Sequence, residues 1–96
     1  MKKIHIDIET RSTIDLKKSG THAYAEKAEL LICCWAIDDG EINTWTINSA
    51  GTPEIPMGDD YIYCAHNSQF EQLLLAKTVG ISIPTERWDC TATRAR

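Results

Sequence analysis

The first residues of the chain alternate between apolar and ionisable side chains. Three isoleucines and three ionisable residues take turns along the segment: Ile4, Ile6 and Ile8 against His5, Asp7 and Glu9. A period of two places successive side chains on opposite faces of an extended chain. The pattern therefore predicts a β-strand over Lys2–Glu9, with the isoleucines in a core and two carboxylates together on the other face.

Two more strands are predicted to follow this one. Leu30–Ile37 is a continuous apolar run of eight residues, which is typical of a buried strand and far short of the roughly 20 residues that span a membrane. Asp38-Asp39-Gly40 is a turn signal, and Glu41–Ile47 alternates again, so these segments predict a hairpin. Thr10–Ser19 is polar and is predicted to be a loop closed by Gly20. Ala23–Glu29 fits either a short helix or an extended connection.

The second half of the chain predicts a loop, a strand and a helix. Asn48–Asp60 contains two prolines and two glycines and is predicted to be a loop. Tyr61–Ala65 is predicted to be a strand, and Asn67 is a suitable cap for a helix that Gly80 ends. A final strand is predicted over Arg87–Cys90, and Thr91 is predicted to cap a helix that starts at Ala92. That helix would have only five residues before Arg96, which is too short to be stable alone, so we expect the chain to be a fragment.

Composition excludes several classes of protein. Hydrophobic residues make up 43% of the 96 residues and charged residues 25%, as in ordinary globular domains. The net charge of −4 disfavours a basic surface of the repressor or histone kind, although a nuclease that works through bound cations needs acids at its centre. The start of the chain turns acidic at Asp7, before any stretch of signal-peptide length. The four cysteines form no Cys-x-x-Cys pair, so we expect free thiols in a reducing cytoplasm rather than a zinc site.

Asp7 and Glu9 are the sharpest candidates for chemistry. Side chains at i and i+2 of a strand share a face, with Cα atoms about 7 Å apart. Two carboxylates brought to ~4 Å repel by about 1 kcal/mol in water and by about 4 kcal/mol at an effective dielectric constant near 20. A bound Mg²⁺ or Mn²⁺ would offset this repulsion, since both ions prefer oxygen ligands. The alternative is that both acids simply face solvent on a half-exposed strand.

A second candidate segment opens the predicted helix. Asn67 and Glu71 lie one helical turn apart, directly after a strand, and so share a face. Open α/β sheets gather ligands at the ends of their strands. The alternative is a capped helix whose Glu71 is a solvated acid that the helix dipole favours.

Together the two segments resemble a known family. Asp7-Ile8-Glu9-Thr10 is similar to the first motif of the DEDD (DnaQ-like) 3'-5' exonucleases, and Asn67-x-x-Phe70-Glu71 is similar to the second. The longer stretches around both motifs, 5–12 and 65–71, resemble the proofreading domain of phage-type family A DNA polymerases. Segments 20–25, 30–40 and 87–96 fit that pattern too, so the resemblance covers nearly the whole chain.

The resemblance implies a fold and a reaction. The fold would be the N-terminal portion of an RNase H-like mixed α/β sheet, with residues 1–96 forming the first part of one exonuclease domain whose C-terminal helices are missing. The reaction would be two-metal hydrolysis of phosphodiester bonds at the 3' end of single-stranded DNA. The implied sheet order begins with three antiparallel strands, followed by a strand beside the first one and then a helix. The implied core is Ile4, Ile6, Ile8, Leu31, Cys33, Trp35, Ile62 and Cys64, with Leu73 and Leu74 packed on it.

The resemblance also implies a role for each matching residue. Asp7 would bridge two Mg²⁺ or Mn²⁺ ions, Glu9 would help to hold one of them, and Glu71 would act on the other through water. Thr10, through its backbone, and Phe70, by stacking, would position the terminal nucleotide. Asn67 would either orient the site or only cap the helix.

Two departures from the family pattern matter. Glu71 stands where the family usually has an aspartate, one methylene shorter. The third motif, Tyr- or His-x-x-x-Asp, is missing, because no tyrosine or histidine of the chain has an aspartate four residues later. We therefore expect the general base and a further carboxylate to lie beyond Arg96, and the 96 residues alone to be inactive.

Other expectations follow from this interpretation. The expected partners are a DNA 3' end and a polymerase domain in the full-length chain, with self-association through an incompletely covered sheet and no membrane contact. The expected location is the cytoplasm of a bacterial host or phage-infected cell. Two alternatives stay open: a catalytically dead RNase H-like remnant or nucleic-acid-binding module, and an RNA-directed exonuclease of the same fold, since no residue that senses a 2'-hydroxyl can be identified.

Overall fold

A five-stranded mixed sheet forms the centre of the protein. The computed structural model describes residues 2–90, and the sheet order is β3-β2-β1-β4-β5. The strands are β1 (Lys2–Ser12), β2 (Ala28–Ile37), β3 (Asn43–Thr46), β4 (Tyr61–Ala65) and β5 (Trp88–Cys90). β1, β2 and β3 are antiparallel neighbours, whereas β4 runs parallel to β1 and β5 parallel to β4. The predicted order of the first four strands is confirmed.

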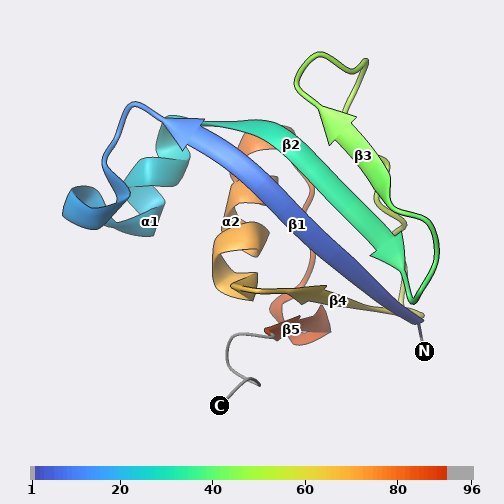
Figure 1. Cartoon of the computed structure of the whole chain (residues 1–96). Helices are drawn as coiled ribbons and strands as arrows, with labels where there is room; N and C mark the ends of the chain where they lie inside the picture. The colour runs from blue at the N-terminus through green and yellow to red at the C-terminus, as the bar shows by residue number, and fades with distance from the viewer. Residues whose placement is uncertain (1, 91–96) are drawn as a thin grey trace.

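The helices lie at one end of the sheet and behind it. Helix α1 (Leu16–Glu26) connects β1 to β2, α2 (Ser68–Val79) follows β4, and a single 3₁₀ turn, η1 (Thr85–Arg87), precedes β5. In Figure 1, α1 lies at the end of the sheet where β1 finishes and β2 begins, and α2 runs behind these two long strands. No helix within residues 2–90 is long and apolar enough to cross a membrane.

The core lies between the sheet and α2. Ile4, Ile6 and Ile8 are buried together with Leu74 and Leu75 of the helix. The predicted inward face of β1 is therefore confirmed. The opposite face of β1, which carries Asp7 and Glu9, is exposed.

Three residues of the predicted core are placed differently. Glu9 pairs with Ile32 and Thr10 pairs with Leu30, so a β-bulge leaves Leu31 as an extra residue. Because of this extra residue, the β2 side chains before the bulge point to the opposite face from the one that strict alternation predicts. Leu30 is therefore buried in the place predicted for Leu31. In β4, Tyr63 pairs with Ile4 and enters the core. Ile62 and Cys64 therefore point to the other face, where Ile62 is half-buried and Cys64 is buried.

The polar segment predicted to be a loop forms mostly strand and helix. β1 continues through Ser12, because Thr10, Arg11 and Ser12 still pair with the start of β2. α1 begins at Leu16 and is capped by Asp15, whose Oδ1 accepts a hydrogen bond from the backbone N–H of Lys17 at 2.9 Å. Gly20, at φ 81° and ψ 172°, kinks the helix. In the segment that fitted either helix or extended chain, helix continues to Glu26 and β2 starts at Ala28.

The other predicted elements match the structure closely. The turn at Asp38–Gly40, the strand Tyr61–Ala65 and the loop before it are confirmed, and the predicted third strand is shortened to Asn43–Thr46. Asn67 caps α2 by accepting from the backbone N–H of Phe70 at 3.4 Å. Gly80 ends the helix in the left-handed conformation. The predicted helix after Thr91 lies outside the described residues.

The long loop between β3 and β4 is fixed by its own contacts. Pro53 and Ile55 are buried. The indole N–H of Trp45 donates to the Gly51 carbonyl at 3.2 Å, and the Tyr63 hydroxyl donates to the Pro56 carbonyl at 2.7 Å. The loop therefore closes one side of the core.

Candidate active site

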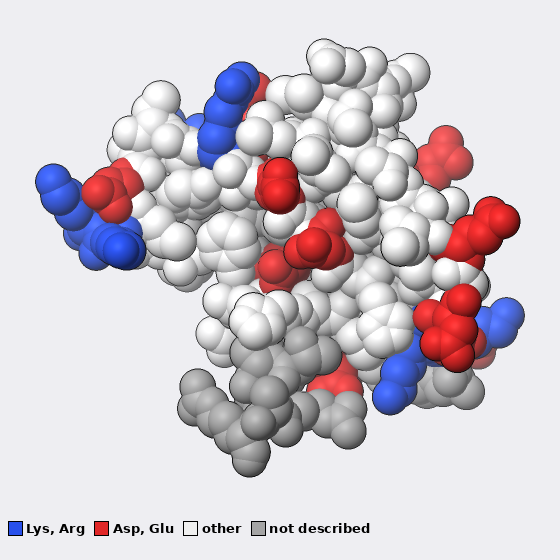
Figure 2. Space-filling model, viewed as in Figure 1, with Lys and Arg blue, Asp and Glu red and all other residues white. Residues whose placement is uncertain are grey.

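Every side chain on the outward face of β1 between Lys3 and Arg11 is ionisable. These residues, all exposed, are Lys3, His5, Asp7, Glu9 and Arg11. Figure 2 shows acidic side chains gathered over the middle of β1 and beside the start of α2, with no lysine or arginine among them. The structure therefore confirms that Asp7 and Glu9 share one face of the strand.

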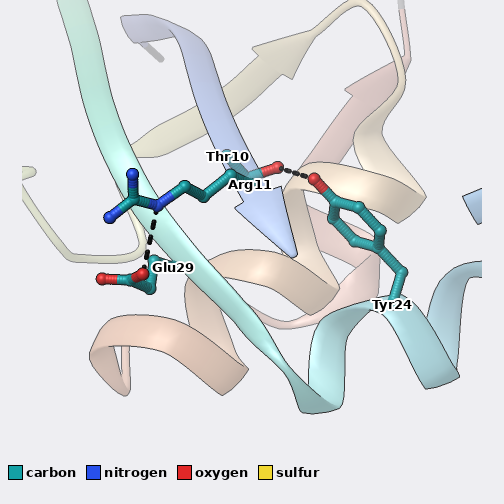
Figure 3. A network of polar contacts seen from close by, with 4 residues as sticks. All are labelled: Thr10, Arg11, Tyr24 and Glu29. Carbon is teal, nitrogen blue, oxygen red and sulfur yellow. Dashed lines mark hydrogen bonds and ion pairs between the residues drawn. The ribbon is translucent and has the colours of Figure 1, made fainter. Parts of the chain in front are cut away.

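Arg11 is held away from the two acids by an ion pair. Its Nε lies 3.1 Å from Oε1 of Glu29 on β2, as Figure 3 shows. Both side chains are more than half exposed, 66% and 52%, so the pair contributes about 1 kcal/mol or less to stability. The nearest basic residue along the strand is therefore engaged with an acid outside the candidate site.

Glu71 lies in the first turn of α2 and is buried, with only 7% of the residue exposed. This differs from a solvated first-turn acid. A buried carboxylate is costly unless it is hydrogen-bonded, paired or bound to a cation. Asn67 is exposed and caps the helix, and Phe70 is half-buried against the core. The capping role of Asn67, one of the two roles left open, is the one seen.

The strand next to β1 ends beside Asp7. Parallel pairing of β1 and β4 runs from Lys2–Tyr61 to His5–Cys64. β4 ends one residue later, at Ala65, and the chain turns into α2. The pairing of β1 with β4 therefore stops two residues before Asp7. The turn that leads into α2 begins just after this point.

Tyr24 links two of the predicted substrate-binding residues. Its hydroxyl is 2.9 Å from Oγ1 of Thr10, and its ring centroid is 6.0 Å from that of Phe70, with the planes tilted by 42°. Ser12 strengthens the same junction by donating to the Tyr24 carbonyl at 2.8 Å. In Figure 3, Thr10 reaches toward Tyr24 of α1 while Arg11 reaches away toward β2. Sequence reasoning missed Tyr24, because its contacts with Thr10 and Phe70 depend on how α1 packs and leave no local pattern in the sequence.

The described residues do not form a complete metal centre. Between residues 2 and 90, no group of three or more His, Cys, Asp and Glu side chains is arranged to hold a metal ion. The structure thus brings Asp7 and Glu9 together but does not join Glu71 to them as a third ready ligand. Two carboxylates still fit Mg²⁺ in one respect, since this ion is commonly bound by one or two carboxylates, several waters and substrate phosphates.

Two cavities flank the candidate site, and their charges differ. One has a volume of about 550 Å³ and lies over the open face of β1 and β2, where Asp7, Asp38 and Asp39 all contribute to its lining. The other has a volume of about 590 Å³ and lies between α1 and α2, where Asn67 and Phe70 contribute to its lining. Predicted site residues therefore border both.

Burial limits the reactivity of the cysteine thiols. Cys33, Cys34 and Cys64 are free thiols. Burial, and to a lesser extent the neighbouring Cys34 and Asp7, raises the pKa of Cys33 from 9.0 to about 12. Cys34 is half-exposed on the opposite face of β2, next to Asp7 in the strand pairing. Cys33 is therefore a packing residue, not a nucleophile.

Comparison with known proteins finds a similar segment in a phage protein. The chain is 34% identical to a DNA polymerase of Bacillus phage SP02 over 104 aligned positions, which include 99% of the chain. The chain spans only 16% of that polymerase. No protein-family model and no solved structure matches the chain. Almost the whole chain is therefore similar to one segment of a phage DNA polymerase.

Proposed function

We propose that this chain is the first part of a metal-dependent 3'-5' exonuclease region of a phage-type DNA polymerase. Its fold would be the N-terminal portion of an RNase H-like domain. The observation that carries the proposal is the pair of exposed carboxylates, Asp7 and Glu9, at the point of the sheet where β4 ends and α2 begins. The substrate would be the 3' end of a single DNA strand.

The topology supports this proposal. A central strand with acids on its open face lies between an antiparallel β2 and a parallel β4, which is compatible with an RNase H-like sheet. Polar groups at the carboxyl ends of neighbouring parallel strands meet at one edge of a sheet, where α/β proteins bind ligands. Asp7 lies within β1, just past the point where the pairing with the parallel β4 stops, and the start of α2 follows the end of β4.

The roles of individual residues follow from their positions. Asp7 and Glu9 would hold Mg²⁺ or Mn²⁺ together with a DNA phosphate, and Glu71 would join through water. A bound ion of this kind activates water and stabilises the leaving oxygen. Thr10 and Phe70, joined through Tyr24, would position the terminal nucleotide, and Asn67 would fix the start of α2.

The relative supports the polymerase context. The similarity to a phage DNA polymerase covers 99% of this chain. A polymerase that removes its own errors needs a nuclease centre with carboxylates rather than a basic groove, and the net charge of −4 agrees with such a centre. The polymerase domain and a general base would then be supplied by residues outside this chain.

Hydrolysis of 5'-labelled single-stranded DNA in Mg²⁺ tests the proposal, using a full-length polymerase that carries this region. We expect shortening from the 3' end, and we expect Asp7→Ala to abolish it while primer extension continues. Asp39→Ala is the matched control, because Asp39 is an exposed acid in the turn after β2. If Asp7→Ala and Asp39→Ala shorten the strand at the same rate, the assignment is wrong.

A catalytically inactive remnant of the same fold is the second candidate. The absence of a three-ligand group within residues 2–90 is the observation that favours it. Calorimetry with Mn²⁺ separates the two candidates, because an active-site precursor should bind the ion and a dead remnant should not. If Glu9→Gln leaves Mn²⁺ binding unchanged, the ion binds outside the proposed site, and this result would favour the remnant.

A further inference from the structure

Glu9 lies where β1 has reduced support from its neighbouring strands. Its pairing with Ile32 is the last before the register shifts, and pairing resumes at Thr10 with Leu30. On the other side of β1, the pairing with β4 has already ended at His5. A β-bulge disrupts the hydrogen-bonding ladder and redirects the side chains beside it. The direction of the Glu9 side chain therefore depends on how β1 is held just beyond the bulge.

Tyr24 of α1 holds this next part of β1 at two points. Its hydroxyl lies 2.9 Å from Oγ1 of Thr10, and its carbonyl accepts a hydrogen bond from Oγ of Ser12 at 2.8 Å. We call these two contacts the Tyr24 clamp. Successive residues of a strand point to opposite faces, so Thr10 and Ser12 lie on the face opposite Glu9. The clamp therefore reaches β1 from behind the acidic face and leaves Glu9 exposed.

The clamp is anchored in the rest of the fold. The half-buried side chain of Tyr24 packs against the core, and α1 packs against α2. Ser12 is also tied locally, because its Oγ accepts from the backbone N–H of Ile14 at 3.1 Å. The contact on the other face of β1, between Arg11 and Glu29, is mostly solvated and contributes little. The Tyr24 clamp is therefore the contact that joins the end of β1 to the core.

Metal binding is sensitive to support of this kind. The ligands of a metal site must stay within about 0.5 Å of their productive geometry. Groups that orient a ligand without touching the ion change metal affinity by about 10–100-fold when they are removed. Consecutive Cα atoms are about 3.8 Å apart, so a displacement of Thr10 passes directly to Glu9. Asp7 is further from the clamp and pairs regularly with Cys34, so it would move less.

We propose that Tyr24 is a positioning residue for Glu9. By holding Thr10 and Ser12, it fixes the end of β1 and with it the separation of the Glu9 and Asp7 carboxylates. This inference rests on the proposed function, which makes these two acids metal ligands. It assigns α1 to the metal site through a residue that contacts neither the ion nor the DNA.

Titration of the ¹⁵N-labelled chain with Mn²⁺ tests the proposal, with paramagnetic broadening of the amide signals as the readout. We expect Tyr24→Phe to raise the dissociation constant for Mn²⁺ by about tenfold. Broadening at Glu9 should also weaken relative to broadening at Asp7, because the ion stays with the acid that is better held. A loss of stability alone would leave this ratio unchanged.

Matched variants separate positioning from stability. Tyr63→Phe also removes one hydroxyl, which breaks the 2.7 Å hydrogen bond to the Pro56 carbonyl, and it should leave the affinity for Mn²⁺ unchanged. Thr10→Val removes the hydroxyl at the other end of the contact, so it should weaken binding as Tyr24→Phe does. Thr10→Ser keeps that hydroxyl and should bind Mn²⁺ like the unaltered chain.

The possible failures can be told apart. If the unaltered chain shows broadening at Asp7 and Glu9 but Tyr24→Phe and Thr10→Val bind Mn²⁺ equally well, the positioning role is rejected and the metal site stands. Equal weakening by Tyr63→Phe would reject the positioning role as well. If the unaltered chain shows no broadening at either acid, the proposed function fails, and this inference fails with it.

Discussion

The β-bulge opposite Glu9 makes a sharp prediction about two adjacent leucines. Without the bulge, strand alternation would place Leu31 in the core with Cys33 and Trp35. With it, Leu30 is 3% exposed and packs in the core, while Leu31 is half-buried. Leu30→Ala and Leu31→Ala remove the same atoms from neighbouring positions, so each variant is the control for the other.

The expected magnitudes differ severalfold. Truncating a buried leucine costs about 2–5 kcal/mol, which includes the cavity left behind. Leu31→Ala should cost about 1 kcal/mol, roughly half the free energy of burying a leucine side chain. A domain of this size has a free energy of unfolding of about 5–14 kcal/mol. Leu30→Ala should therefore remove a large part of the stability.

Urea unfolding followed by tryptophan fluorescence measures both values. With a slope near about 2 kcal/mol per molar urea, Leu30→Ala should lower the midpoint by about 1–2.5 M and Leu31→Ala by about 0.5 M. Equal losses, or a larger loss for Leu31→Ala, would mean that the bulge is absent and that Leu31, not Leu30, packs in the core.

Three further predictions concern the Thr10–Tyr24 contact, the thiol of Cys33 and the end of α2. Tyr24→Phe and Thr10→Val should each lower the free energy of unfolding by about 1 kcal/mol, and the double variant should lose less than the sum, measured in the same urea titration; additive losses would show that the 2.9 Å contact is not formed. Since the pKa of Cys33 rises from 9.0 to about 12 on folding, its thiol stays neutral in the folded state while it ionises in the unfolded state. The free energy of unfolding should thus fall above pH 9 by up to about 1.4 kcal/mol per pH unit, and it should fall less in Cys33→Ala. With Ellman's reagent, the half-exposed Cys34 should react well before Cys33. Gly80 has a φ of 73° and open space where a Cβ would lie, so Gly80→Ala should cost about 1 kcal/mol through backbone strain alone and lower the melting temperature by about 4–8 °C; an unchanged melting temperature would contradict the left-handed end of α2.

The elements with strong local signals could be predicted from the sequence. Alternation in β1, the apolar run in β2 and the turn at Asp38–Gly40 determine structure over a few residues. Asn67 and Gly80 mark the ends of α2 by local hydrogen bonding and backbone conformation. The bulge at Leu31 could not be predicted, because it depends on how β1 and β2, which α1 separates along the chain, pair with each other.

The candidate site was predictable in part for the same reason. The common facing of Asp7 and Glu9 follows from strand geometry alone. The burial of Glu71 and the contact of Tyr24 with Thr10 depend on how helices dock on the sheet, which no local pattern encodes. The first half of α1 was predicted to be a loop because Gly20 and the polar residues around it have low helix propensity, and the helix packs against α2, a contact that no local pattern encodes.

Paramagnetic NMR with Mn²⁺ tests the central claim most directly. Trace Mn²⁺ added to the ¹⁵N-labelled chain broadens amide signals near the bound ion. The account predicts selective broadening at Asp7, Glu9 and the first turn of α2, which Asp7→Asn abolishes without unfolding the chain. Broadening confined to the turn at Asp38 and Asp39, or no selective broadening at all, would contradict a metal-dependent nuclease site on β1.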